Sequence, residues 1–198
     1  MEKIDRRPDL DAPCGKNLTY RSFIQCGETQ ARTNLANLPK ELDSYLALSR
    51  LASRILDPVW DRFGPVRLTY GFSSHELIKK IPDRIAPGLD QHAAHERNSI
   101  GNFICKRLGA ACDFHIPGQD MQEVATWVFR NTPVDRIYFY GSDKPIHVSC
   151  SEQPAHQFVD MLVNPKNNRR TPRVRRVVWD TQVDILPRIG SPRCLRIV

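Results

Sequence analysis

The middle of the chain holds the side chains best suited to chemistry, four histidines and one isolated aspartate. They are His92, His95, His115, His147 and Asp113, and the aspartate lies in an otherwise apolar run. Imidazole nitrogens with one carboxylate oxygen form the ligand set of a catalytic zinc ion, which keeps one coordination position open for water. A chance grouping of histidines is the alternative interpretation.

Two predicted strands would carry two of these groups inward. Residues 108–114 are apolar and small, which is typical of a buried strand bearing Asp113, and residues 146–149 favour a strand bearing His147. A buried carboxylate needs a partner, which an arginine, backbone N–H groups or a metal ion could supply. One metal ion would serve both Asp113 and His147. His92 and His95 are three residues apart and would share a face on a helix.

The remaining pattern predicts an α+β fold, a small antiparallel sheet packed against helices. Strands are expected to begin near Val66, Gly109, Val134 and Pro145. Helices are expected over residues 39–57, where Pro58 either restarts or kinks the helix, and over 120–131, which opens with a capping box. We expect three segments, an irregular lead-in over 1–37, a domain over 38–160 and a basic tail over 161–198.

The order of these motifs resembles the zinc D-alanyl-D-alanine carboxypeptidase and murein endopeptidase family, of the Hedgehog/DD-peptidase fold. Asp90-Gln91-His92 stands for the family's Ser-x-His, residues 109–114 for Gly-x-Ala-x-Asp, and residues 145–149 for the motif with the last histidine. The resemblance covers roughly residues 66–150. It implies that His92, Asp113 and His147 converge as ligands of Zn²⁺, and that the substrate is a peptide or peptidoglycan-type molecule.

The sequence departs from the family pattern in three places. Residues 93–107 form an insertion between the first two ligands, Phe72 stands where the family has a substrate-steadying arginine, and Lys144 stands where it has its general base. Asp143 and Glu96 are the candidate replacements for the base. A solvent-facing turn residue is the alternative reading of Asp143.

His95 and His115 are spare imidazoles beside the predicted ligands. His115 lies two residues from Asp113, so on a strand both side chains face the same side of the sheet. We expect these two histidines to support the ligands or to touch substrate, and not to bind the metal.

The positive charge of the chain is concentrated at its C-terminal end. Residues 161–198 contain nine basic and two acidic residues, whereas the rest of the chain is balanced. A cluster of arginines attracts phosphates without reading base sequence, which predicts non-specific nucleic-acid binding. The cluster consists of Arg169, Arg170, Arg173, Arg175 and Arg176. A solvated segment without a partner, or an edge strand formed with the interleaved valines, are the alternatives.

Composition limits the class of protein. The chain is 40% hydrophobic and 26% charged, which favours a globular fold, and no apolar run is long enough to span a bilayer. No apolar stretch follows the charges at the N-terminus, so we expect no secretion signal and a cytoplasmic location. The six scattered cysteines, without a C-x-x-C pair, are expected to be reduced and packed as small apolar groups.

These observations predict a zinc-dependent hydrolase of peptidase type, in which a metal-activated water attacks an amide carbonyl. Without export, a cell-wall peptide would be reached only after lysis, as for phage enzymes. The alternative is a catalytically degenerate, metal-stabilised binding module with a basic tail that attracts nucleic acid.

Overall fold

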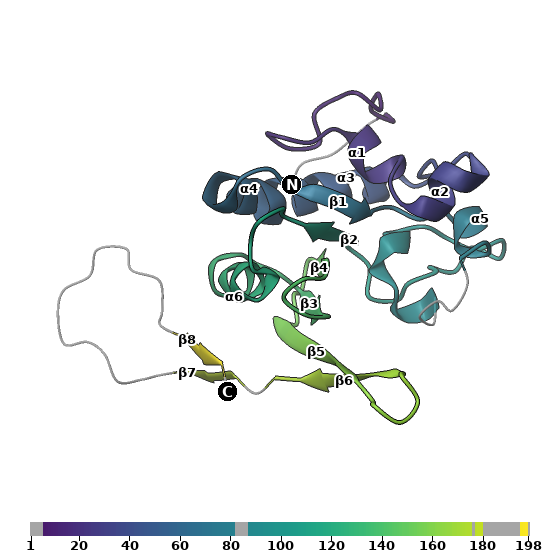
Figure 1. Ribbon diagram of the computed structural model, residues 1–198. Coiled ribbons are helices and arrows are strands. Elements are labelled where there is room, and N and C mark those ends of the chain that lie inside the picture. The colour runs from purple at the N-terminus through teal and green to yellow at the C-terminus, as the bar shows by residue number, and fades with distance from the viewer. Residues whose placement is uncertain (1–5, 82–86, 176, 180–194, 198) are drawn as a thin grey trace.

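A computed structural model describes residues 6–81, 87–175, 177–179 and 195–197. Its helices and strands follow one another along the chain as drawn in Figure 1. The helical elements are α1 (Tyr20–Ile24), α2 (Glu28–Thr33), α3 (Leu42–Leu51), η1 (Ala52–Leu56), α4 (Asp57–Phe63), α5 (His75–Ile78), η2 (Pro87–Leu89), η3 (Gln91–Ala93) and α6 (Met121–Asn131). The strands are β1 (Arg67–Tyr70), β2 (Ala110–His115), β3 (Arg136–Phe139), β4 (Ile146–Cys150), β5 (Gln157–Val163), β6 (Arg170–Val174), β7 (Val177–Trp179) and β8 (Leu195–Ile197).

Six of the strands form one mixed sheet in the order β1-β2-β4-β3-β5-β6, and β7 pairs with β8 separately. The α+β class is therefore confirmed, but the expected wholly antiparallel sheet is wrong because β3 and β5 are parallel. After β4 the chain reverses and passes beyond β3, and it therefore arrives parallel to that strand. Asp135 anchors this crossing, because its carboxylate accepts a hydrogen bond from the Ala155 N–H at 2.7 Å.

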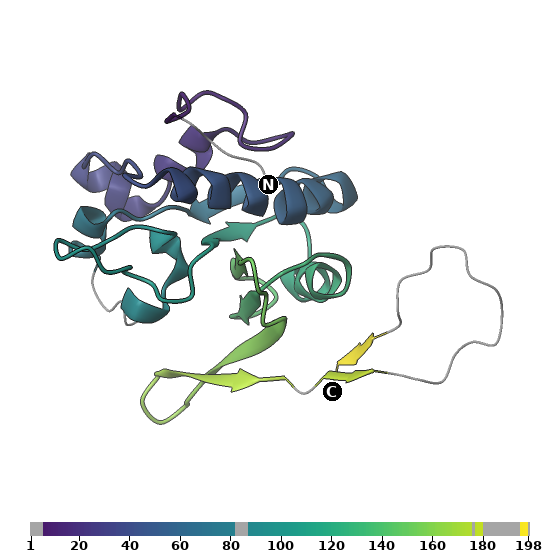
Figure 2. The same ribbon diagram turned by 180° about the vertical axis from the view of Figure 1, so that it is seen from behind.

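Helices cover one face of the sheet. In Figure 2 the α3–η1–α4 segment crosses in front of the strands, and α6 lies below α4. Leu48 and Leu51 of α3 are buried in one cluster with Phe114 of β2 and Val148 of β4. These strand residues alternate with Asp113 and His147, which therefore face the opposite side of the sheet.

The predicted helix over 39–57 begins at Leu42 and continues past Pro58 as α4, with a change in its hydrogen-bond pattern just before the proline. Residues Ala52–Leu56 form a π-helical turn, in which the N–H of Asp57 reaches the carbonyl of Ala52, and α4 begins at Asp57 with the proline in its first turn. Proline has no N–H to donate, so the first turn after the π-helical segment accommodates it. The helix over 120–131 is confirmed as α6.

The segment over 1–37 is not irregular throughout. It contains α1 and α2, and Tyr20, Phe23 and Ile24 of α1 are buried in the main core. A five-residue helix is too short to show a helical period, and the sequence pattern therefore gave no sign of it. Five cysteines are buried and free of disulfides, whereas Cys194 lies outside the described residues.

The predicted tail begins inside β5, which continues to Val163 and pairs with β6 as a hairpin. This hairpin projects from the body of the molecule in Figure 1. All five residues of β6 are exposed. No helix among the described residues is long and apolar enough to cross a membrane.

Candidate metal centre

Asp113 and His147 are brought together by strand register. They are directly opposed in the antiparallel pair of β2 and β4, so their side chains leave the same face of the sheet. Asp113 Oδ1 lies 2.8 Å from His147 Nδ1. The side chain of His147 is largely buried and that of Asp113 partly so.

His92 reaches the same point from a loop over the open face of the sheet. Its backbone N–H donates to the side chain of Asp90, which caps the short helix η3. His92 Nδ1 lies 2.7 Å from the carbonyl oxygen of Gly71. Because a carbonyl only accepts hydrogen bonds, Nδ1 carries the proton and Nε2 is directed to Asp113, 3.4 Å from Oδ1.

Gly71 is essential to this orientation because the chain packs tightly there. A Cβ at this position would lie 2.2 Å from the carbonyl oxygen of Phe23, closer than any real contact. The N–H of Phe72 donates to that same carbonyl at 2.9 Å. The absence of a side chain at Gly71 thus lets α1 hold the segment whose carbonyl fixes His92.

The three side chains form a group that fits a metal ion. Each offers one ligand atom, and these atoms lie within 4.8 Å of one another. A ligating histidine normally donates its other ring N–H to a carbonyl or carboxylate, as His92 does to Gly71. The structure therefore brings His92, Asp113 and His147 together as predicted, and zinc binding by them remains a prediction.

Electrostatics favour an ionised carboxylate at this position. Burial alone would raise the pKa of Asp113, but the neighbouring imidazoles of His92 and His147 hold that pKa well below its usual range. Burial likewise would lower the pKa of His92, and the Asp113 charge outweighs this so that the pKa is raised. A charged carboxylate oxygen beside two imidazoles is suited to a divalent cation.

Two tyrosines flank the cluster, and the sequence pattern did not single them out. Tyr70 and Tyr138 are cross-strand neighbours of Asp113 and His147, which puts the four residues in one row across four strands. The Tyr70 ring is 4.3 Å from the His92 ring, and the Tyr138 ring is 5.2 Å from the His147 ring. Only the register, which the sequence does not specify, places these phenols beside the ligands.

Arg107 approaches the same row from the inserted segment. Its guanidinium donates to the hydroxyl of Tyr138 at 3.1 Å and to the carbonyl oxygen of Leu89 at 3.3 Å. An arginine therefore lies close to the cluster although Phe72, at the family's arginine position, is fully buried in the core. Because Arg107 lies in a long insertion, nothing in the sequence indicated that it would approach the cluster.

The two spare histidines do not join the cluster. The expected helical face shared by His92 and His95 is wrong, because Ala94 has a φ of 46° and ends the short helix. His95 Nε2 instead accepts a hydrogen bond from the N–H of Gly109 at 3.2 Å. His115 lies at the end of β2, opposite Arg67 of β1.

Neither candidate base belongs to the cluster. Glu96 is buried, and its carboxylate accepts hydrogen bonds from the N–H groups of Lys40 and Glu41 and from the Ser44 hydroxyl at 2.9–3.2 Å. It therefore holds the N-terminus of α3. Asp143 is 77% exposed in the turn between β3 and β4 and forms an ion pair with Lys144 at 3.1 Å.

No family model matches this chain, and neither the curated proteins nor the solved structures contain a significant match.

Proposed function

We propose that this protein is a zinc-dependent hydrolase that cleaves amide bonds of peptides. The observation that supports the proposal is the convergence of His92 Nε2, Asp113 Oδ1 and His147 Nδ1 on one point of the open sheet face. Two nitrogens and one oxygen leave a position free for water, which is the arrangement of a catalytic zinc site. The resemblance to the DD-peptidase family suggests peptidoglycan-type peptides as the substrate.

Zinc bound there would polarise a substrate carbonyl and bring the pKa of a bound water toward 7. The residues of the chain would supply orientation and proton transfer. Gly71 fixes the ring of His92, and the β2–β4 register fixes Asp113 against His147. We assign the general base to Asp143, which lies outside the cluster in the turn that leads into β4, so this role requires its exposed side chain to move toward the site when substrate binds.

The Tyr138 hydroxyl, held by Arg107, is a hydrogen-bond donor at the rim of the site. It is suited to stabilise negative charge that develops on a carbonyl oxygen during attack. This pair offers a cationic contact near the centre, which Phe72 cannot provide.

A metal-stabilised binding module without catalytic activity is the second candidate. It is favoured by the positions of the two carboxylates, because Glu96 serves the N-terminus of α3 and Asp143 is exposed and paired with Lys144. In such a module the ion would hold the inserted segment onto the sheet and contribute to folding.

Turnover by the full-length protein distinguishes the two candidates. The zinc-loaded protein is incubated with peptides ending in D-alanyl-D-alanine and with peptidoglycan fragments, and released amines are measured. Hydrolysis that is lost in His147→Ala and retained in His115→Ala supports the enzyme. Zinc binding without hydrolysis supports the binding module.

A further inference from the structure

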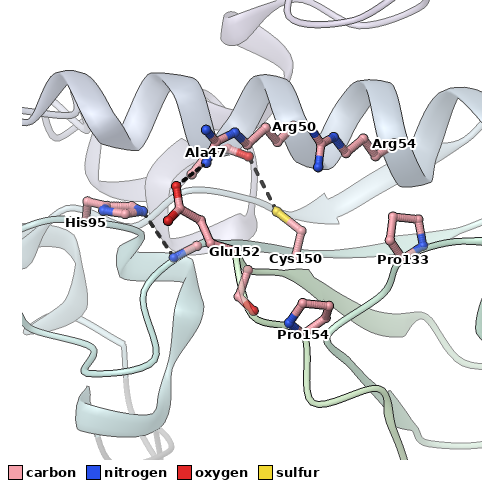
Figure 3. A pocket seen from close by; sticks show the side chains of 10 residues that line it. Ala47, Arg50, Arg54, His95, Pro133, Cys150, Glu152 and Pro154 are labelled. Carbon is pink, nitrogen blue, oxygen red and sulfur yellow. Dashed lines mark hydrogen bonds and ion pairs between the residues drawn. The ribbon is translucent and has the colours of Figure 1, made fainter. Parts of the chain in front are cut away.

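Two adjoining cavities are lined by the segment that joins β4 to β5. The smaller one lies between that segment and α3 (Figure 3), and the larger one is lined instead by residues 107–109 and 135–136. Their volumes are about 90 and 430 Å³, and they share His95, Gly109, Ser151 and Glu152 in their walls. None of the three clustered ligands lines either cavity.

Gln91, the residue before His92, hydrogen-bonds to the wall of the larger cavity. It is buried, and its amide donates to the Leu108 carbonyl and to Asp135, both at 2.9 Å. Leu108 and Asp135 are themselves wall residues of the larger cavity. The larger cavity shares Arg107 with the rim of the candidate metal centre, but none of the three clustered ligands lines either cavity. The anion contacts proposed below are Arg50, Arg54 and Ser151, so the inference does not rest on the proposed hydrolase function.

The walls carry an excess of positive charge. Arg50, Arg54, Arg107 and Arg136 face two acids, Asp135 and Glu152. His95 adds no charge, because its Nε2 accepts a hydrogen bond from Gly109 and burial lowers its pKa. A hollow with more cations than anions raises the local concentration of anionic ligands.

Two of the four arginines are already neutralised. Arg136 pairs with Asp135 at 2.6 Å, and Arg50 pairs with Glu152 at 2.8 Å. Arg54 has no carboxylate partner among the described residues, and Arg107 contacts only neutral oxygens there.

Arg50 and Arg54 are four residues apart and lie along the helical wall of the cavity in Figure 3. Like charges at this spacing repel one another, so an anion held between them would be stabilising.

Ser151 lines both cavities and has an unused hydroxyl. Its Oγ is buried and has no hydrogen-bond partner among the described residues. A buried hydroxyl without a partner is costly, and a bound oxygen atom would remove that cost. The hydroxyl and the two helical arginines together can provide both charge and a directed hydrogen bond for an oxyanion.

We propose that these cavities bind a small organic ligand through a carboxylate or phosphate group, held by Arg50, Arg54 and Ser151. In the unliganded protein Arg50 is paired with the carboxylate of Glu152, which is 70% exposed. This carboxylate occupies the position that the anionic group of the ligand would take. Glu152 reaches across from the β4–β5 segment to the helix in Figure 3, and binding of the ligand displaces it.

Calorimetric titration of the full-length protein with inorganic phosphate and, separately, with succinate tests this site. We expect saturable binding of at least one of them, and the tighter of the two identifies the preferred group. Arg54→Ala should weaken binding about tenfold or more, as expected for the loss of a charged hydrogen bond. Glu152→Gln should tighten binding several-fold, because it removes the internal competitor.

Arg62→Ala is the matched control, since Arg62 is an exposed arginine of α4 that lines neither cavity. It should bind both anions as the parent does. Arg54 is itself exposed, so its replacement should leave the fold intact, which circular dichroism checks. Absence of saturable binding at tens of millimolar anion, or unchanged binding in both Arg54→Ala and Glu152→Gln, would overturn the proposal.

Discussion

Asp113 lies directly across the β2–β4 pair from His147, and its Oδ1 is 2.8 Å from His147 Nδ1. The same oxygen is 3.4 Å from Nε2 of His92. Strand pairing thus fixes two members of the cluster, whereas the third depends on a loop and on the carbonyl of Gly71. The loop is where the site is most easily disturbed.

Gly71→Ala should impair the site without touching a ligand. The added methyl group would collide with the carbonyl of Phe23 and shift the segment that orients His92. We expect zinc affinity to fall about 10- to 100-fold, as for other changes that disturb the support of a ligand. Overpacking should also cost about 1–3 kcal/mol of stability. Zinc titration and urea denaturation measure the two effects.

Gly88→Ala is the control for this substitution, because no atom lies within 4 Å of the Cβ it would add. It should change zinc affinity little. Equal affinity in the parent and in Gly71→Ala would show that the Gly71 carbonyl does not govern His92.

The sequence was informative where a candidate ligand lies in a segment whose apolar pattern indicates a strand. Asp113 and His147 lie in short apolar runs, so their strands and inward direction could be predicted. The direction of His95 could not, because the positive φ of Ala94 breaks a helix that the spacing suggested.

Other parts of the site depend on contacts between distant segments. Tyr138 flanks the cluster only through the β3–β4 register, and Arg107 reaches it only because the inserted segment folds back over the sheet. The parallel pairing of β5 with β3 depends on a chain crossing that Asp135 holds. No local sequence pattern indicates this crossing.

Glu96→Gln should act on stability more than on chemistry. The carboxylate holds backbone N–H groups at the start of α3, and an amide can accept fewer of these bonds. We expect a loss of about 1–2 kcal/mol in the free energy of unfolding. Turnover per folded, zinc-loaded molecule should change little.

The loss of unfolding free energy in Glu96→Gln should depend on pH, because the pKa of Glu96 differs between the folded and unfolded states. Burial raises that pKa above its ordinary value of 4.5, although the Glu41 N–H and the Ser44 hydroxyl act in the opposite direction. The folded state therefore binds the proton more tightly than the unfolded state. The stability advantage of the parent over Glu96→Gln should be largest below pH 4.5 and decrease as the pH rises through the folded-state pKa. Urea denaturation of both proteins between pH 4 and 7 checks the trend.

Asp143→Asn should retain zinc and lose hydrolysis. Removal of a general base typically lowers the rate about 100- to 10,000-fold. The side chain is exposed, so the substitution should not affect folding. Steady-state hydrolysis with zinc content measured on the same sample tests the assignment. An unchanged rate in an active parent would remove Asp143 from the mechanism.

The arginines near the C-terminus should not contribute equally to nucleic-acid binding. Arg169 and Arg173 are exposed, whereas Arg175 forms two hydrogen bonds of 2.6 Å with Asp160. Arg170 donates to two backbone carbonyls and lies over the ring of Tyr140, and Arg176 lies outside the described residues. Arg169→Ala with Arg173→Ala should weaken binding to duplex DNA and reduce its salt dependence.

Arg175→Ala should instead lower stability, because it leaves the partly buried Asp160 without its partner. Titrations at several salt concentrations compare the variants. If the parent shows no salt-dependent binding, nucleic acid is not a partner of this segment.

Zinc content is the measurement that tests the central claim most directly. The full-length protein is loaded with zinc, dialysed and analysed by atomic spectroscopy, alongside Asp113→Ala, His147→Ala and the control His115→Ala. We predict one zinc ion per chain in the parent and in His115→Ala, and a large loss in the other two variants. A parent without zinc, or Asp113→Ala and His147→Ala proteins that retain it fully, would contradict the assignment of His92, Asp113 and His147 as a metal site.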